Sequence, residues 1–292
     1  ETRTYTGTGV DNPAASISLD LGPAGFHAQV LSPTGTWYID PEHRGDDQTH
    51  IAYRRSDLLD AHGPWREEEA LGSLAARAAD TTVSARTAPT AARTSGTVLR
   101  TYRLALAATG EYSIYHGGTV PLVHQALVTA VNRINALFRR ELSVQFQLVA
   151  GNDTLIFLNP ATDGYTTTNA DLLLNQNQTA IDGFIGNNNY DIGHVFSTSG
   201  GGKAGLGVVA VTGQKARGET GNPAPTGDAF WIDFVAHEIG HQFGAQHTFS
   251  GVAGNCAGNG VADDAVEPGS GSSIMGYAGI CGADDLQSRT TP

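Results

Sequence analysis

The chain is poor in sulfur and in positive charge. Its 292 residues include two cysteines and one methionine, and 17 Lys and Arg stand against 29 Asp and Glu, a formal net charge of -12. This charge argues against a nucleic-acid partner or an anionic membrane surface as partner.

Long apolar runs are also missing. None approaches the roughly 18 residues that cross a bilayer, so no membrane span is predicted. No signal peptide is visible, because Glu1 opens a polar Thr- and Gly-containing run, and we expect the numbering to start after processing or within a longer precursor. Hydrophobic residues nevertheless make up 40%, enough for the core of one large domain or two ordinary ones.

The two cysteines, Cys256 and Cys281, bracket a Gly-rich stretch. A cross-link there would close a loop and stabilise the fold by about 3–4 kcal/mol. We therefore predict a disulfide, and with it an oxidising, extracellular compartment.

The first 71 residues are predicted to form a β-rich module. Ile17, Leu19 and Leu21 alternate with polar residues, and similar short patterns follow between Gly and Pro. Residues 72–97 are rich in Ala, Thr, Ser and Arg and have few apolar anchors, which predicts an exposed linker. The linker is either a site of precursor processing, with cuts near Arg77, Arg86 or Arg93, or a plain tether.

From residue 98 to 292 the pattern alternates between strands and helices, which indicates an α/β domain. Strands are expected at 99–106, 144–148, 191–196 and 208–211, and helices at 119–138 and 174–185. Residues 205–211 are either the edge strand that pairs with an extended peptide or an ordinary sheet edge.

The stretch HEIGHQFGAQH at residues 237–247 has the spacing of a metal site. His237 and His241 are one helical turn apart, on a helix for which Asp228 is a suitable N-cap. Gly244 can adopt a left-handed conformation and end the helix, after which His247 can return as a third ligand.

Three neutral histidines leave one position of tetrahedral zinc for water, as in catalytic sites. Glu238 adjoins the first histidine and can act as general base on a zinc-activated water. A structural zinc site would use four protein ligands and would not need Glu238.

Downstream lies SIMGY at 273–277, with the only methionine of the chain. A long zinc motif followed by a methionine turn resembles the metzincin clan of metallopeptidases, and with EPGSGS at 267–272 it is most similar to the bacterial reprolysin-like (adamalysin-type) branch. The resemblance covers residues 98–285 and, more loosely, 1–70 as a prosegment. It implies a twisted mixed sheet with a zinc-motif helix, zinc on His237, His241 and His247, Glu238 as general base and Met275 as the floor under the metal.

The sequence departs from this family in two places. Typical reprolysins have Asp after the third histidine, where this chain has Thr248. Only 17 residues follow Met275, whereas metzincin domains usually close with a further helix, so we expect either a domain truncated at its C-terminus or a part of a longer protein.

Reprolysin precursors often silence the zinc with a prosegment cysteine, but none precedes Cys256. We therefore expect the prosegment to lie over the zinc cleft and to inhibit through a carboxylate. The candidates in the sequence are Asp46, Asp47, Asp60 and Asp80.

Two further features of the sequence, Tyr277 and an acidic group at residues 263–267, can each be interpreted in two ways. Tyr277, two residues after Met275, is either a fifth zinc ligand or oxyanion stabiliser, or a packing tyrosine. Asp263, Asp264 and Glu267 have oxygen ligands suited to calcium but lack regular spacing, which favours a solvated acidic loop. The other seven histidines show no ligand spacing and are expected at the surface or satisfied in the core.

These features predict a secreted zinc endopeptidase that hydrolyses internal peptide bonds of protein or peptide substrates. Two alternatives are a secreted binding protein on a zinc-stabilised scaffold and a non-peptidase zinc hydrolase. Glu238 argues against the first, and an open cleft beside an edge strand would argue against the second.

Overall fold

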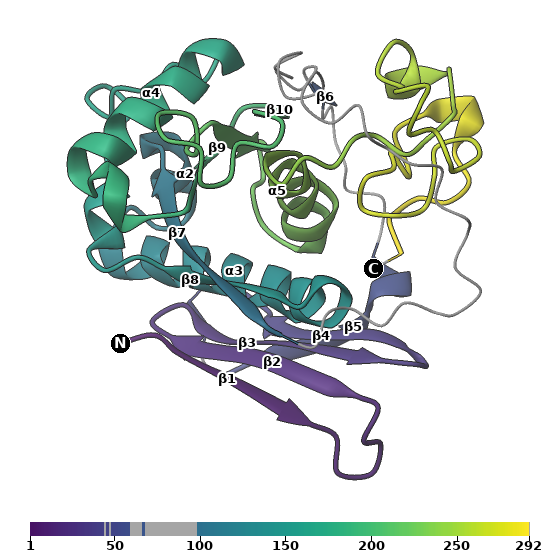
Figure 1. The fold of residues 1–292 in the computed structure, drawn as a ribbon. Coiled ribbons are helices and arrows are strands. Elements are labelled where there is room, and N and C mark those ends of the chain that lie inside the picture. The colour runs from purple at the N-terminus through teal and green to yellow at the C-terminus, as the bar shows by residue number, and fades with distance from the viewer. Residues whose placement is uncertain (44, 47, 59–65, 68–97, 292) are drawn as a thin grey trace.

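The computed structural model describes residues 1–43, 45–46, 48–58, 66–67 and 98–291, and all structural statements below concern these residues. They form two sheets with helices between and around them, a mixed α/β architecture (Figure 1). The predicted linker at 72–97 lies outside the described residues. Within the described part no helix is both long and apolar enough to span a membrane.

The N-terminal sheet is an antiparallel meander of five strands in sequence order. The strands are β1 (Arg3–Thr8), β2 (Ser16–Gly22), β3 (Gly25–Ser32), β4 (Gly35–Pro41) and β5 (His50–Arg54), followed by the 3-10 turn η1 (Arg55–Asp57). The β-rich character expected for this region is confirmed.

The second sheet has six strands in the order β6-β10-β11-β9-β7-β8. They are β6 (Arg66–Glu67), β7 (Arg100–Ala108), β8 (Val144–Leu148), β9 (Ile192–Ser197), β10 (Gly201–Ala204) and β11 (Gly218–Gly221). All pairs are parallel except β10 with β11, so the sheet is mixed, as predicted.

The helices of this domain are α2 (Gly110–Tyr115), α3 (Val120–Leu142), α4 (Ala170–Phe184), the π-helix η4 (Ala229–Val235) and α5 (Ala236–Gln242). Short 3-10 turns lie at η2 (Asn152–Leu155), η3 (Asn187–Asn189), η5 (Gly254–Cys256) and η6 (Gly282–Asp284). Helices α3 and α4 lie where the two longer helices were expected from the sequence.

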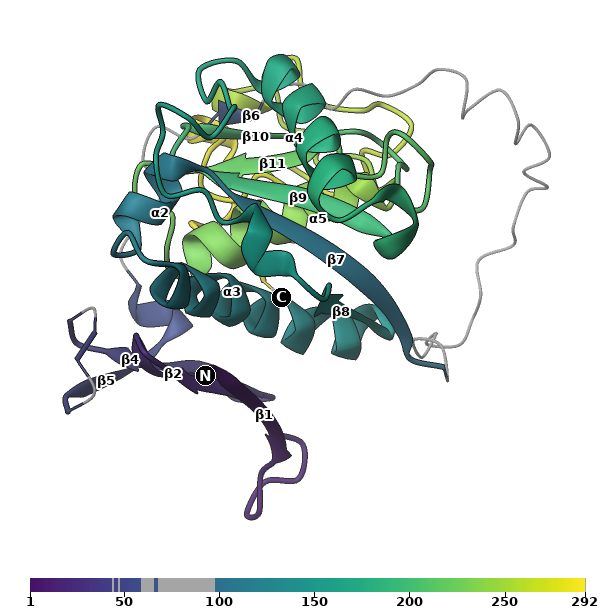
Figure 2. The ribbon, with the colours of Figure 1, turned by 90° about the vertical axis from the view of Figure 1, so that its left-hand side faces the viewer.

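Strand β7 shows how the sheet separates two helical layers. Leu104 and Leu106 join the apolar cluster built with α3, η4 and α5, whereas Ala105 and Ala107 join the cluster built with α4. Successive side chains of a strand point to opposite faces, so both faces of β7 are covered. Figure 2 shows α4 on the near side of this sheet and α5 beyond it.

One predicted strand is wrong. Residues 208–211 form turns instead of a strand, and Gly207 (φ +65°), just before them, and Ala210 (φ +62°) have left-handed backbones. The amides of Gly207 and Val209 instead donate to the carbonyls of His241 and Gln242, at 2.9 and 3.2 Å. These bonds satisfy the last carbonyls of α5, so the segment caps a helix and does not extend the sheet.

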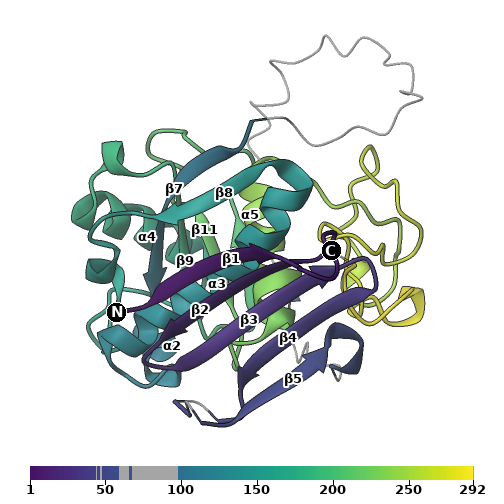
Figure 3. The ribbon, with the colours of Figure 1, turned by 90° about the horizontal axis from the view of Figure 1, so that it is seen from below.

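The N-terminal sheet packs on α3 (Figure 3), and polar side chains of the sheet contact this helix. In β2 the buried side chains are Ser18 and Asp20, while Leu21 is half exposed. Thr129 of α3 donates to Asp20 at 2.8 Å, and Arg133 donates to Asp40 of β4 at 2.7 Å. The contact is therefore held by buried hydrogen bonds and charges as well as by apolar packing.

Candidate active site

The motif helix enters the site from a π-helix. Segment η4 is buried along its whole length and leads directly into α5, and Ile232, Val235 and Ile239 pack in the core as expected. Asp228 precedes η4 but makes no side-chain cap, which corrects the predicted N-cap. Its buried carboxylate instead lies 3.5 Å from the guanidinium of Arg133, because a buried charge needs an opposite charge more than a helix end needs a cap.

Helix α5 ends as the sequence predicts. Gly244 has φ +96°, and the amide of Ala245 donates to the carbonyl of Gly240 at 3.0 Å. A side chain at 244 would be strained in this left-handed conformation. The sharp end brings His247 back beside His241, with their Nε2 atoms 3.1 Å apart.

The three histidines form a metal-ligand group. One ligand atom from each of His237, His241 and His247 lies within 4.8 Å of the others, and all three side chains are buried. Their Nδ1 atoms bond backbone carbonyls of Ile274, Ala245 and Asn259, at 2.6, 2.7 and 2.6 Å respectively.

A carbonyl oxygen only accepts, so each Nδ1 carries the proton and each Nε2 presents a lone pair. Three lone pairs that converge at this distance repel one another unless a cation lies between them. Neutral imidazoles whose second nitrogen donates to a carbonyl are the usual ligands of zinc. The donor set therefore fits zinc.

Glu238 is fully buried and lies against the sheet. A Cβ built on Gly202 of β10 would be 2.3 Å from Glu238 Oε1, so the absence of a side chain at 202 makes room for this carboxylate. Strand β10 thus places its backbone next to the expected general base.

Met275 and Tyr277 both reach the histidine group. A Cβ on Gly240 would meet Met275 Sδ at 2.5 Å, so Met275 lies directly against α5. The Tyr277 ring is buried, with its centroid 4.8 Å from that of His247 and 5.6 Å from that of His237. Tyr277 packs against the rings of His237 and His247, and this contact is consistent with both of its interpretations.

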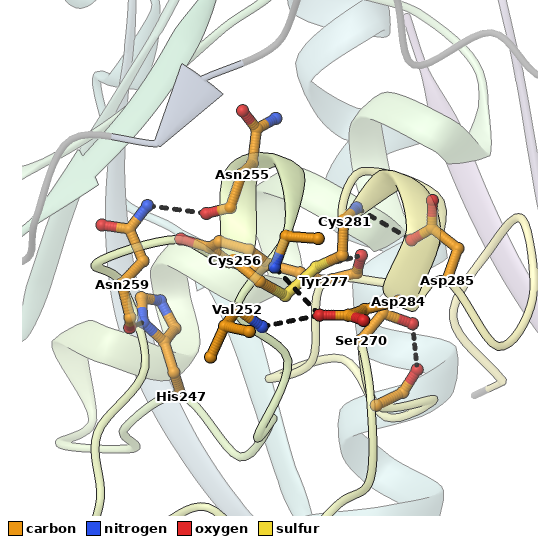
Figure 4. Close-up of a disulfide and its surroundings, with 12 residues drawn as sticks. His247, Val252, Asn255, Cys256, Asn259, Ser270, Tyr277, Cys281, Asp284 and Asp285 are labelled. Carbon is orange, nitrogen blue, oxygen red and sulfur yellow. Dashed lines mark hydrogen bonds between the residues drawn. A yellow bond between two sulfur atoms is a disulfide. The ribbon is translucent and has the colours of Figure 1, made fainter.

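The predicted disulfide between Cys256 and Cys281 is present, with the Cα atoms 5.1 Å apart (Figure 4). Asp284 accepts from the amides of Val252 and Ala253 at 2.7 and 2.9 Å, so the same loop is also held by a carboxylate. The loop carries the Asn259 carbonyl that orients His247. The cross-link therefore supports the third histidine.

The acidic residues of this region are not gathered into a ligand group in the described structure. Among these residues, the ligand group close enough to hold an ion is the histidine triad, and Asp263, Asp264 and Glu267 do not form one. Glu267 instead accepts hydrogen bonds from Thr248 and Ser273.

The buried residue His194, to which the sequence assigned no function, contacts the helix that carries the zinc motif. His194 of β9 lies 2.9 Å from Oε1 of Gln242, the residue after His241, and 2.9 Å from the hydroxyl of Thr220. Burial lowers the pKa of His194 to about 4. Nothing in the local spacing connects positions 194 and 242, so sequence reasoning could not find this contact.

The five-stranded N-terminal sheet does not lie over the histidines. It packs on the side of α3 that faces away from α5 (Figures 1 and 3). Within the described part of the predicted prosegment, β6 lies at the site, where it pairs in parallel with β10 at Gly201 and Gly202.

Of the expected inhibitory carboxylates, Asp46 accepts local bonds from Gln48 and Thr49, at 2.8 and 3.3 Å. The other three candidates, Asp47, Asp60 and Asp80, lie outside the described residues. None of the four is placed against the histidines by the described structure.

Three histidines and a glutamate on this mixed sheet and helix arrangement define the class of zinc-dependent peptidases. Residues 98–290 match the family described as metallo-peptidase family M12B, reprolysin-like. This match covers well over half of the chain, which therefore belongs to that family of metallopeptidases.

Solved structures give a weaker comparison. The crystal structure of myroilysin is 15% identical, with a TM-score of 0.29, and the match covers 55% of this chain and 49% of that one. At this TM-score the likeness carries no argument, and the chain spans about half the length of that structure. No curated protein matches the chain.

Proposed function

We propose that the chain is a secreted precursor of a zinc endopeptidase in which His237, His241 and His247 hold the metal and Glu238 is the general base. The observation that carries this proposal is the arrangement of the three histidines. Each Nδ1 donates a hydrogen bond to a backbone carbonyl, and the three Nε2 lone pairs converge. The disulfide supports an oxidising compartment.

When bound, zinc polarises the scissile carbonyl and lowers the pKa of water toward about 7. Glu238 takes a proton from the attacking water and delivers it to the leaving amine. Its burial beside β10 excludes competing solvent from the carboxylate.

The edge of β10 is the proposed site for the substrate backbone. Residues 66–67 already pair there, so this edge accepts an extended strand next to Glu238. An extended peptide bound along it would bring an internal bond to the histidines, which favours a peptidase over a hydrolase of small molecules or a binding scaffold.

The same pairing supports inhibition by the N-terminal region. While residues 66–67 occupy β10, a substrate strand cannot pair with it, so the precursor is less active than the processed enzyme. Here the β6 strand blocks the edge, and the five-stranded sheet serves as its anchor on α3.

The test uses zinc-loaded protein and a denatured protein substrate. Proteolysis should stop on addition of a chelator and return with zinc, and Glu238→Gln should keep the metal but lose about 10²–10⁴-fold in rate. Near-normal turnover by the zinc-loaded variant would contradict the role of Glu238.

A second comparison addresses the N-terminal region. Precursor and protein cut between residues 77 and 97 are assayed at one neutral pH, with zinc content measured in both. Equal proteolysis at equal zinc content would rule out inhibition by the N-terminal region.

A further inference from the structure

One carboxylate lies between the two segments that orient the zinc-binding histidines. Glu267 accepts five hydrogen bonds. On one side the hydroxyl of Thr248 donates to its Oε1 at 2.5 Å, and on the other the amides of Ser272 and Ser273 donate to its Oε2 at 2.7 and 3.0 Å. Thr248 follows His247, and Ser273 precedes Ile274.

Each segment holds one ligand. The carbonyl of Ile274 accepts a hydrogen bond from Nδ1 of His237. The position of the turn at 272–275 therefore sets the orientation of the first histidine. The amide of Thr248 donates to the carbonyl of Met275 at 3.1 Å, which joins the chain after His247 to the same turn.

The backbone around Glu267 reinforces this connection. The amide of Glu267 donates to the carbonyl of Thr248 at 2.8 Å, and a β-bridge joins it to Phe249. Gly271 has φ +69° and leaves room for the carboxylate, since a Cβ there would lie 3.2 Å from Glu267 Cδ.

The carboxylate is ionised at every pH at which the protein would work. Burial opposes ionisation, but the hydrogen bonds from the hydroxyls of Ser273 and Thr248 and from the two serine amides lower the pKa of Glu267 to about 2. Bonds from neutral donors to a charged acceptor are roughly twice as strong as neutral ones.

We infer that Glu267 is a positioning residue of the zinc site: its carboxylate fixes His237 through the 272–275 turn and His247 through Thr248. This inference rests on the zinc site proposed above and deepens it. It also gives a reason why this chain carries threonine after its third histidine, since the carboxylate that holds the motif comes from residue 267 and the threonine supplies the donor.

The first test measures zinc affinity by competition with a chelator, and the visible spectrum of the cobalt-substituted protein, which reports ligand geometry. Residues that orient metal ligands contribute about 10–100-fold to affinity. Glu267→Leu should lose about 10-fold or more and change the cobalt spectrum.

Two gentler variants keep the test valid if Glu267→Leu does not fold. Glu267→Gln can turn its amide oxygen to the serine amides and its NH₂ to Thr248, so its loss should be smaller. Thr248→Val removes the hydroxyl through which Glu267 holds the residue after His247, and it should also weaken zinc binding. Asp163→Asn is the matched control, because Asp163 is a buried loop carboxylate that accepts hydrogen bonds from the amides of Gly110 and Tyr165, neither of which belongs to the segments around Thr248 and Ser273.

The sharpest test exchanges the carboxylate between the two positions. Thr248→Asp in the wild-type background puts two carboxylates in contact and should weaken zinc binding. The same change in the Glu267→Gln background restores one charge beside Ser273 and should recover affinity. The effect of one substitution thus changes sign with the residue at 267.

Unchanged affinity and cobalt spectrum in Glu267→Leu, Glu267→Gln and Thr248→Val would overturn the inference while leaving the proposed function intact. The same sign for Thr248→Asp in both backgrounds would also overturn it. Failure of the wild-type protein to bind zinc would reject the proposed function, and the inference with it.

Discussion

His194 in the middle of the sheet donates from Nδ1 to Oε1 of Gln242, at 2.9 Å, and so joins strand β9 to the zinc-motif helix. The direction of the bond is fixed because the Nε2 of Gln242 donates to the carbonyl of Gly193 at 2.8 Å. Thr220 then donates to the Nε2 of His194, which leaves the ring neutral and fully bonded.

The neutral state of His194 predicts sensitivity to acid. Its folded pKa of about 4 lies below the ordinary 6.5, so its contribution to stability is fully present above pH 6.5 and is lost as the pH falls toward 4. The loss should reach roughly 3 kcal/mol. It is measured by urea unfolding of metal-free protein between pH 7.5 and 4.5.

His194→Asn is the comparison, because all other titratable groups are the same in both proteins and cancel in the difference. The variant should be less stable at pH 7.5 and should lose less stability on acidification. Parallel stability curves for the two proteins would contradict the assignment.

Gly202→Ala should reduce proteolysis with little effect on folding. The added methyl group needs the space that Glu238 Oε1 occupies, so the carboxylate must leave the position in which we propose that it acts as general base. We expect kcat to fall by about 10²-fold, with zinc content unchanged. Gly183→Ala, in α4 with open space around it, should have no effect on proteolysis.

The Cys256–Cys281 disulfide should stabilise the fold and the third zinc ligand. It closes a span of 25 residues, for which removal should cost about 3–4 kcal/mol. The double variant Cys256→Ser/Cys281→Ser should also bind zinc more weakly, because its loop holds the Asn259 carbonyl that orients His247. Chelator competition and thermal unfolding measure the two effects, and freely alkylatable thiols in the native protein would contradict the cross-link.

Arg133 should be the residue on which attachment of the N-terminal sheet depends most. It is buried between Asp40 of β4 and Asp228 before η4, and its guanidinium lies over the rings of Tyr38 and Trp231. Arg133→Leu removes this cation from the buried carboxylate of Asp228 and the partly buried one of Asp40, which should cost about 3–5 kcal/mol.

In protein cut within the linker, this variant should release the N-terminal sheet on size-exclusion chromatography, whereas the wild type retains it. Arg140→Leu is the control, because the pair of Arg140 with Glu141 is exposed and contributes little. Release from Arg140→Leu, or retention by Arg133→Leu, would show that the attachment lies elsewhere.

The sequence by itself determined the features that depend on local spacing. His237 and His241 share a helix face because they are four residues apart, and Gly244 ends that helix because it tolerates positive φ. The alternation of strand and helix patterns likewise gave the α/β class, and the two cysteines had only each other as partner.

Tertiary structure decided whatever depends on contacts between distant residues. The turn at 208–211 has a strand-like composition, but the amide of Val209 donates to a carbonyl at the end of α5. The local sequence pattern cannot predict this distant partner. The sequence predicts Asp228 as a helix N-cap, but in the folded protein its carboxylate pairs with Arg133 of another helix.

The position of the N-terminal sheet was decided in the same way. Its alternation left open which face is buried, and the charged partners on α3 selected the polar one. Glu267 reads as one of several acidic residues in a glycine-rich loop, and only folding brings Thr248 and Ser273 to its carboxylate. Buried polar groups take whichever partner the fold supplies, because leaving them unpaired costs more than a local preference contributes.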